Sequence, residues 1–272
     1  MTASIALSFD IEQITNSNLS RVRISGSDNA IVREIDFILE LCEEFQVKAT
    51  FFVLAELLKK CENAIHKIAS NGHEICSHSI SHRLLYNLSV TELRNEIIDS
   101  KKMLEDALGV QVYGFRAPSW SVSQNMQNLY YDLLSEAGYK YSSSIFPGKN
   151  FLYGIMNADS NVNQTSNGII EFPVPVLIAG KHKLGFSGGA YFRFFPLYLT
   201  QKGIQKYLNN GRQIFLYYHP WEFPIEEYRI EGSFYEKILL GFGRKYLTNK
   251  VRKVLNIYKG EVKTMQQVLN IF

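Results

Sequence analysis

The sequence predicts an α/β protein built on a parallel β-sheet, either open or closed into a barrel. Apolar runs typical of strands alternate with segments whose apolar residues recur at helical spacing. The 272 residues, 46% of them hydrophobic, can bury the core of one large barrel-type domain or of two small domains. No internal repeat or proline-rich linker divides the chain, so we expect a single domain over residues 1–272.

The predicted elements follow one another in the order of βαβ units. The expected strands cover residues 4–10, 47–53, 73–78, 112–118, 139–144, 169–176 and 212–218. The expected helices cover residues 28–45, 63–72, 89–109, 123–138 and 199–211. The helix over 89–109 has the clearest ends, because Ser89 and Glu92 can form a capping box and Gly109 can end the helix.

Three segments depart from this alternation. Residues 147–168 are rich in Asn and Ser and are expected to form a long loop, which is either functional or without a role. Residues 181–196, "KHKLGFSGGAYFRFFP", are expected to form a hairpin or loop. From about residue 232 we expect a helical extension, whose basic stretch over 241–260 is interpreted as a solvated helix face, or alternatively as a surface for anionic lipid or phosphate.

Composition excludes several classes of function. The net charge of +3 without a long basic block gives no reason to expect a nucleic-acid partner. The cysteines Cys42, Cys61 and Cys76 lack C-x-x-C spacing, so neither a disulfide framework nor a thiolate zinc site is expected. No export signal or stretch of membrane-spanning length is visible, which predicts a cytoplasmic protein without a transmembrane segment. The oligomeric state is not indicated.

Two carboxylates stand at the end of the first strand. In "IALSFDIEQ", Asp10 and Glu12 are two residues apart and face the same side if the strand persists. Such a pair suits a shared metal ion or a shared proton, although the acids of a strand end can also simply meet water. The carboxyl ends of parallel strands lie on one face, so residues at other strand ends decide between these readings.

Three further strand ends carry reactive side chains. In "HSISH", His78 and His82 have a spacing suited to one metal ion if they begin a helix or turn, or they are capping or core residues. In "YGFRAPSWS", Arg116 can keep a carboxylate ionised, or form a structural salt bridge, while Pro118 stiffens the turn. In "IFLYYHPWEF", His219 ends the most apolar strand and is placed to act as a general acid, or is structural.

These motifs, taken in order, resemble the polysaccharide deacetylases with a NodB-type domain, carbohydrate esterase family 4. "SFDIE" stands at the family's paired-acid motif, "HSISH" is similar to H-[ST]-x-x-x-H, "RAPSW" to R-x-P, and "LYYH" to the motif ending in L-x-H. The segments "GGAYFRFFP" and "HPWEF" resemble the subfamily of bacterial exopolysaccharide and surface-glycan loci. The resemblance implies a distorted (β/α) barrel of seven strands, with the site at the carboxyl ends of the strands.

The resemblance also implies roles for individual residues. Glu12, His78 and His82 would hold a divalent metal, Zn²⁺ by preference, and Asp10 would be the base, with the roles of the two acids open to reversal. Arg116 would steady the base and His219 would be the general acid. A backbone N–H, that of Ser119, would stabilise the oxyanion. The side chains expected to contact the sugar or another part of the substrate are Trp120, Tyr191, Arg193 and Trp221.

Two departures from the family pattern bear on function. The family has adjacent aspartates where this chain has Asp10, Ile11 and Glu12, and Ser142 stands where an aspartate would support the acid histidine. His219 then lacks that partner, unless Glu222 replaces it. The implied function is hydrolytic removal of the acetyl group from an N-acetylated sugar, nucleotide- or lipid-linked, in surface-polysaccharide biosynthesis. The alternatives are a deformylase or another amide or imide hydrolase, and a catalytically inactive glycan-binding protein.

Overall fold

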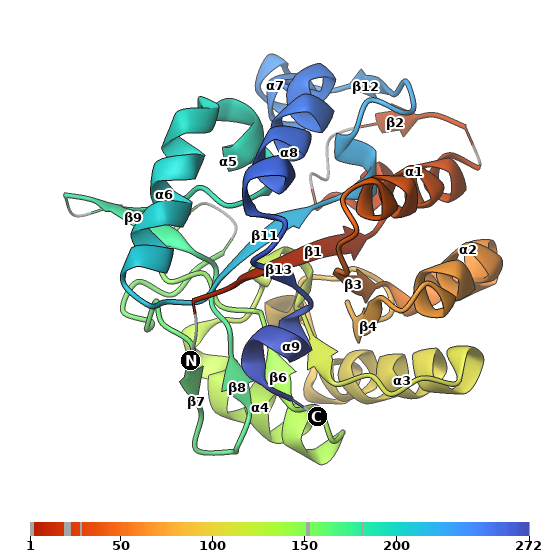
Figure 1. The fold of residues 1–272 in the computed structure, drawn as a ribbon. Helices are drawn as coiled ribbons and strands as arrows, with labels where there is room; N and C mark the ends of the chain where they lie inside the picture. Colours follow the sequence, from red (N-terminus) through yellow and green to blue (C-terminus); the bar gives the residue numbers. More distant parts are fainter. Residues whose placement is uncertain (1–2, 19–22, 28, 151–152, 181, 272) are drawn as a thin grey trace.

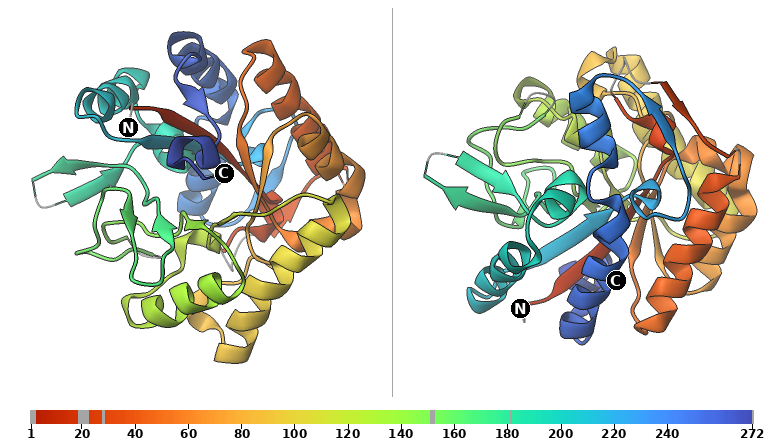
Figure 2. Two further views of the ribbon diagram at one scale, coloured as in Figure 1. Left: turned by 60° about the horizontal axis from the view of Figure 1, so that its bottom comes forward. Right: turned by 90° about the horizontal axis from the view of Figure 1, so that it is seen from above.

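The computed structural model describes residues 3–18, 23–27, 29–150, 153–180 and 182–271. Residue 28 of a predicted helix, and residues 151–152 and 181 of the two predicted loops, lie outside this part. Helices surround a curled sheet in Figures 1 and 2. None of the helices described is long and apolar enough to cross a bilayer.

The curled sheet has nine strands within the described residues. Seven are parallel neighbours, in the order β11 (Ile214–Tyr218), β1 (Ile5–Ile11), β3 (Thr50–Val53), β4 (Glu74–Ser77), β5 (Gly114–Phe115), β6 (Tyr141–Ser142) and β8 (Ile170–Glu171). Each lies within or overlaps a predicted strand, so the distorted α/β barrel is confirmed. At the margins, β7 (Asn163–Gln164) runs antiparallel to β8, and β13 (Val262–Lys263) pairs with the start of β1.

The predicted helices are also present. They are α1 (Ala30–Glu44), α2 (Leu58–Ser70), α3 (Val90–Leu108), α4 (Gln127–Glu136) and α6 (Leu197–Asn209). At the start of α3 the Ser89 side chain accepts a hydrogen bond from the Glu92 N–H, and the Glu92 carboxylate accepts one from the Ser89 N–H. Gly109 takes the left-handed conformation, with φ of 65°, that ends the helix.

The segment over 181–196 forms both a hairpin strand and a short helix. Strand β10 (His182–Gly185) pairs with β9 (Val176–Ala179), which confirms a hairpin, and α5 (Gly189–Phe194) follows directly. Six residues are too few to display helical periodicity, so α5 was not expected. A second small ribbon, β2 (Arg23–Ser25) with β12 (Arg229–Glu231), also carried no recognisable pattern.

Two apolar cores lie on the two faces of the sheet. Ile5, Leu7, Phe9 and Ile11 of β1 belong to the core shared with the surrounding helices, whereas Ala6 belongs to the core inside the curl. This alternation follows from the two-residue period of a strand. It places Asp10 on the inner side, together with Ala6, and the site is built there.

The chain after residue 232 is mostly helical and returns to the sheet. It contains α7 (Phe234–Gly241), α8 (Arg244–Tyr258), strand β13 and α9 (Met265–Leu269). Met265 and Leu269 of α9 pack into the inner core, and Figure 2 (left) shows α9 over the middle of the barrel. The extension therefore covers the end of the barrel opposite the carboxyl ends of the strands.

Candidate active site

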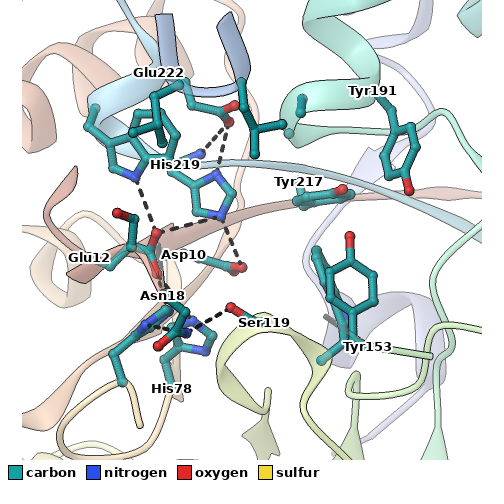
Figure 3. A pocket seen from close by; sticks show the side chains of 18 of the residues that line it. Asp10, Glu12, Asn18, His78, Ser119, Tyr153, Tyr191, Tyr217, His219 and Glu222 are labelled. Carbon is teal, nitrogen blue, oxygen red and sulfur yellow. Dashed lines mark hydrogen bonds and ion pairs between the residues drawn. The ribbon is translucent and has the colours of Figure 1, made fainter. Parts of the chain in front are cut away.

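The polar residues expected at strand ends do meet at the carboxyl end of the parallel strands. Asp10 lies at the end of β1, while His78, Arg116 and His219 directly follow β4, β5 and β11. Phe9 is paired with Tyr218 in the register of β1 and β11, so the next residues, Asp10 and His219, are neighbours. Figure 3 shows Asp10, His78 and His219 converging on one cavity.

Glu12, His78 and His82 form a compact set of metal-ligand atoms. One ligand atom from each lies within 4.8 Å of the other two, and all three residues are buried. Oε2 of Glu12 is 2.5 Å from Nε2 of His82 and 3.7 Å from Nε2 of His78. Two imidazole nitrogens and a carboxylate oxygen are a donor set found in zinc enzymes that keep further positions open.

The histidines are oriented by groups behind them. Nδ1 of His78 is 2.8 Å from the carbonyl oxygen of Arg116, which leaves Nε2 directed to Glu12. Residues 78–82 form a turn rather than a helix, with positive φ at Ser79 (70°) and His82 (57°). Glu96 of α3 accepts two backbone N–H groups of this turn, at 2.7 and 3.1 Å. Glu96 was not recognised in the sequence, since its spacing from the motif has no fixed meaning.

The carboxylate of Glu12 is suited to a cation. Its Oε2 is buried and accepts no hydrogen bond among the described residues, although two imidazoles lie beside it. Burial alone would raise the pKa of Glu12, but the nearby His82 and His219 outweigh it and hold that pKa well below its ordinary value. An ionised, orphaned oxygen between two imidazole nitrogens fits a divalent metal held by Glu12, His78 and His82.

Asp10 is paired with an arginine rather than with the histidines of this set. Nη1 of Arg116 donates to Oδ1 of Asp10 at 2.5 Å, and Nη2 donates to Ser143 Oγ at 3.1 Å. The guanidinium is completely buried between the rings of Phe52 and Phe215, with centroids at 4.0 and 4.8 Å. The arginine thus fixes the orientation of Asp10.

His219 is held by a carboxylate from its own turn. Glu222 Oε2 lies 3.0 Å from Nδ1 of His219 and accepts the His219 backbone N–H, while Oε1 accepts from Nε of Arg193 at 2.7 Å. Nε2 of His219 faces Asp10 and Glu12 at 3.9 and 3.8 Å. Burial lowers the pKa of His219, but the carboxylates of Glu12, Glu222 and Asp10 outweigh it and raise the pKa to about 9.

Glu222 therefore occupies the place left open by the serine at position 142. Ser142 lies on β6, where its Oγ is 2.9 Å from the hydroxyl of Tyr130, and no hydrogen bond among the described residues joins it to His219. The partner of the histidine comes three residues later in the chain instead of from another strand. Because the turn at 220–222 is tight, such a partner is rigidly placed.

Two of the expected substrate contacts have other partners. Arg193 borders the cavity, yet its donors are directed to Glu222 and to three backbone carbonyls between residues 239 and 242. Trp221 donates from Nε1 to Oε1 of Glu12 at 3.2 Å, and its ring stacks on His219. Arg193 and Trp221 thus position the carboxylates and the histidine, and because both also line the cavity, their contact with the sugar stays a prediction.

Aromatic side chains and a strained turn form the remaining wall. The cavity holds about 160 Å³, well below the roughly 300–1,000 Å³ of clefts that enclose a drug-sized ligand. Tyr153, Tyr191 and Tyr217 line it, with Trp120 packed against two of them. Ser119 also lines it, with φ of 50°, in a turn that continues at positive φ into Trp120. The space suits an acyl group and part of one sugar.

Asn18 links the two sides of the site and was not anticipated. Its Nδ2 lies 3.3 Å from Nδ1 of His82 and donates to Ser119 Oγ at 3.0 Å (Figure 3). Tyr153 and Tyr217 were also missed. An asparagine in a loop and tyrosines in apolar or irregular segments carry no sequence signal that separates them from ordinary packing residues.

The sequence of this chain is similar to those of known proteins. Residues 4–142 match the family model described as polysaccharide deacetylase, and residues 143–270 match a domain of unknown function, DUF3473. A peptidoglycan-N-acetylglucosamine deacetylase of Bacillus cereus is 32% identical over 108 residues, which are 40% of this chain and 39% of that protein. The peptidoglycan-N-acetylmuramic acid deacetylase PdaC of Bacillus subtilis is 25% identical over 122 residues, 45% of this chain and 26% of that protein.

Solved structures share the fold across nearly the whole chain. A proposed polysaccharide deacetylase of Mycobacterium smegmatis has a TM-score of 0.63 at 17% identity, covering 98% of this chain and 88% of that one. A CE4 family pseudoenzyme of Bacillus anthracis has a TM-score of 0.54 at 14% identity, covering 98% and 66%. The matches to the curated relatives named above span less than half the length of each. With its amino-terminal half matching the family model, the chain belongs to the polysaccharide deacetylase family.

Proposed function

We propose that the protein is a metal-dependent hydrolase that removes the acetyl group from an N-acetylated sugar. The observation that supports this most directly is the set formed by Glu12, His78 and His82, flanked by Asp10 and His219 in one small cavity. A divalent metal held by the set, Zn²⁺ by preference, would polarise the acyl carbonyl and lower the pKa of water.

The other residues then divide the proton transfers. Asp10, oriented by Arg116, takes a proton from the attacking water. His219, oriented by Glu222 and protonated near neutral pH, delivers a proton to the leaving nitrogen. The turn at Ser119 offers its backbone N–H to the developing oxyanion. Together these groups supply a base, an acid and oxyanion stabilisation for amide hydrolysis.

The sugar is proposed to be an intermediate of surface-polysaccharide biosynthesis, nucleotide- or lipid-linked, handled in the cytoplasm. This rests on the resemblance of "GGAYFRFFP" and "HPWEF" to the subfamily of surface-glycan loci. The named relatives act on peptidoglycan, so assays on soluble N-acetyl sugars, sugar nucleotides and peptidoglycan fragments separate the possibilities.

Acetate release with metal analysis tests the proposal. We expect a chelator to abolish acetate release, Zn²⁺ to restore it, and His78→Ala to remove the bound metal. His182→Ala, which changes an exposed histidine of β10, is the matched control and should keep both metal and activity. Acetate release that survives both the chelator and His78→Ala would overturn the proposal.

A glycan-binding protein without activity is the second candidate. The likeness to a pseudoenzyme and the altered acidic motif favour it. It predicts sugar binding that is indifferent to Asp10→Asn, with no turnover of any substrate. A deformylase or imide hydrolase would instead be revealed by mass spectrometry, as a mass loss different from that of an acetyl group.

A further inference from the structure

Helix α7 presents an apolar strip to solvent beside the site. Phe234 is 80% exposed, Tyr235 59% and Phe242, just beyond the helix, 52%. Phe234, Ile238 and Phe242 are spaced four residues apart, so they follow one line along the outside of the helix. Contiguous exposed apolar residues of this kind mark interaction surfaces.

The strip is not needed to hold α7 in place. Leu240 on the inner side is 4% exposed and packs in a cluster with Ile14 and Trp221. The Ser233 side chain caps the helix by accepting from the Glu236 N–H. Phe234 and Tyr235 therefore contribute little to folding, and another role is required to account for their exposure.

The strip continues into the wall of the cavity. Leu239 of α7 lines the cavity, and the ring of Phe242 stacks on that of Phe194 in α5, with centroids 4.8 Å apart. The same helix α5 carries Tyr191, which also lines the cavity. In Figure 1, α7 and α8 are drawn in blue at the top of the molecule, next to α5.

Within residues 232–259 the charge is strongly one-sided, and the neighbouring strand β12 adds an ion pair of Arg229 with Glu231. Residues 232–259 contain seven Lys and Arg residues and one acid, Glu236, whose carboxylate is occupied by Ser233. Lys237 and Lys245 are exposed and make no ion pair within the described part of the chain. Exposed aromatic residues between unpaired lysines are typical of proteins that lie on anionic membranes.

We propose that α7 and the first turn of α8 form a docking surface for an anionic lipid bilayer. Phe234, Tyr235 and Phe242 would enter the interface, while Lys237 and Lys245 meet the lipid phosphates. Docking would turn the cavity mouth, with Leu239 at its edge, toward the membrane. The docking surface itself does not depend on the proposed function. The further step, in which docking presents a lipid-linked N-acetyl sugar to the cavity, rests on the proposed function.

Vesicle cosedimentation of the full chain tests the surface. We expect binding to equimolar phosphatidylcholine and phosphatidylglycerol, weaker binding to phosphatidylcholine alone, and loss at high salt. K237E/K245E should weaken binding by about tenfold or more, since each lysine near the surface contributes about fivefold in affinity. F234S/Y235S should weaken it by about tenfold or more as well, because binding scales with the apolar area buried in the interface. F234S/Y235S should leave hydrolysis of a soluble N-acetyl sugar unchanged.

Matched controls alter other exposed residues in the same way. Ile178→Ser changes a residue that is 66% exposed on β9, and K59E/K140E makes the same charge change on other surfaces. Both should bind vesicles as the unsubstituted chain does. Failure to bind the mixed vesicles, equal loss in the controls, or a dimer that F234S/Y235S dissolves would overturn the docking surface. Vesicle binding without deacetylation of any sugar would contradict the proposed function alone.

Discussion

Replacing Glu222 by Gln separates the support of His219 from the rest of the site. Glu222 is completely buried and receives three donors: the His219 backbone N–H, Nδ1 of His219, and Nε of Arg193. Its ion pair with Arg193 has both side chains 1% exposed. The amide of Gln keeps the shape but removes the charge and one of the two accepting oxygens. Either Nδ1 of His219 or Nε of Arg193 then faces an NH₂ group, and the guanidinium is left without an anion.

The magnitudes follow from these contacts. Breaking a buried ion pair by changing one partner costs about 3–5 kcal/mol of stability. Loss of the carboxylate that orients a catalytic histidine lowers kcat by up to about 10⁴-fold in a serine protease, where the histidine is both base and acid. In this protein His219 acts only as an acid, so we expect a fall in kcat of roughly 10²–10³ with little change in KM.

A double variant distinguishes the two effects. R193M/E222L replaces both charges by apolar side chains, which commonly restores much of the stability lost when one partner is removed. We expect its thermal unfolding to return toward that of the unsubstituted chain while kcat stays low and metal content is unchanged. Full kcat in Glu222→Gln, or equal recovery of stability and kcat in the double variant, would refute the role of Glu222.

Two further predictions concern stability. Burial, only partly offset by the Tyr228 hydroxyl, raises the pKa of Glu34 from 4.5 to about 7. The free energy of unfolding should therefore fall by roughly 3 kcal/mol as the pH rises between these values. Glu34→Gln should remove this fall in urea unfolding at several pH values, and an unchanged pH profile would contradict the prediction. At Gly188, an added Cβ would lie 1.9 Å from the Tyr217 carbonyl oxygen, so Gly188→Ala should destabilise by at least about 1–3 kcal/mol, and an unaltered melting temperature would show that α5 is not seated there.

The sequence was most informative where chemistry and strand ends coincide. Asp10, His78, Arg116 and His219 each follow an apolar run, and in a parallel sheet the carboxyl ends of the strands share one face. The alternation of β1 also predicted that Asp10 and Glu12 would share a side. Short strands such as β5 and β6, of two residues each, fall within predicted strands whose bounds were overestimated.

The support of the site was harder to predict because it depends on tertiary contacts. Glu96 holds the histidine turn from α3, and Asn18 joins His82 to Ser119, yet neither has a distinctive spacing from the motifs. Arg193 was recognised as a site residue, but whether it contacts substrate or Glu222 depends on where α5 lies. That helix was too short to be recognised from periodicity.

The division of roles between the two acids of β1 is the central claim, and metal content tests it most directly. The account predicts that Glu12→Gln abolishes Zn²⁺ binding, measured by metal analysis and isothermal titration, because Oε2 of Glu12 faces both imidazoles. Asp10→Asn should bind Zn²⁺ with one ion per chain yet release no acetate, because Asp10 is held by Arg116 instead. Zn²⁺ retained by Glu12→Gln and lost by Asp10→Asn would contradict the account and reverse the two roles.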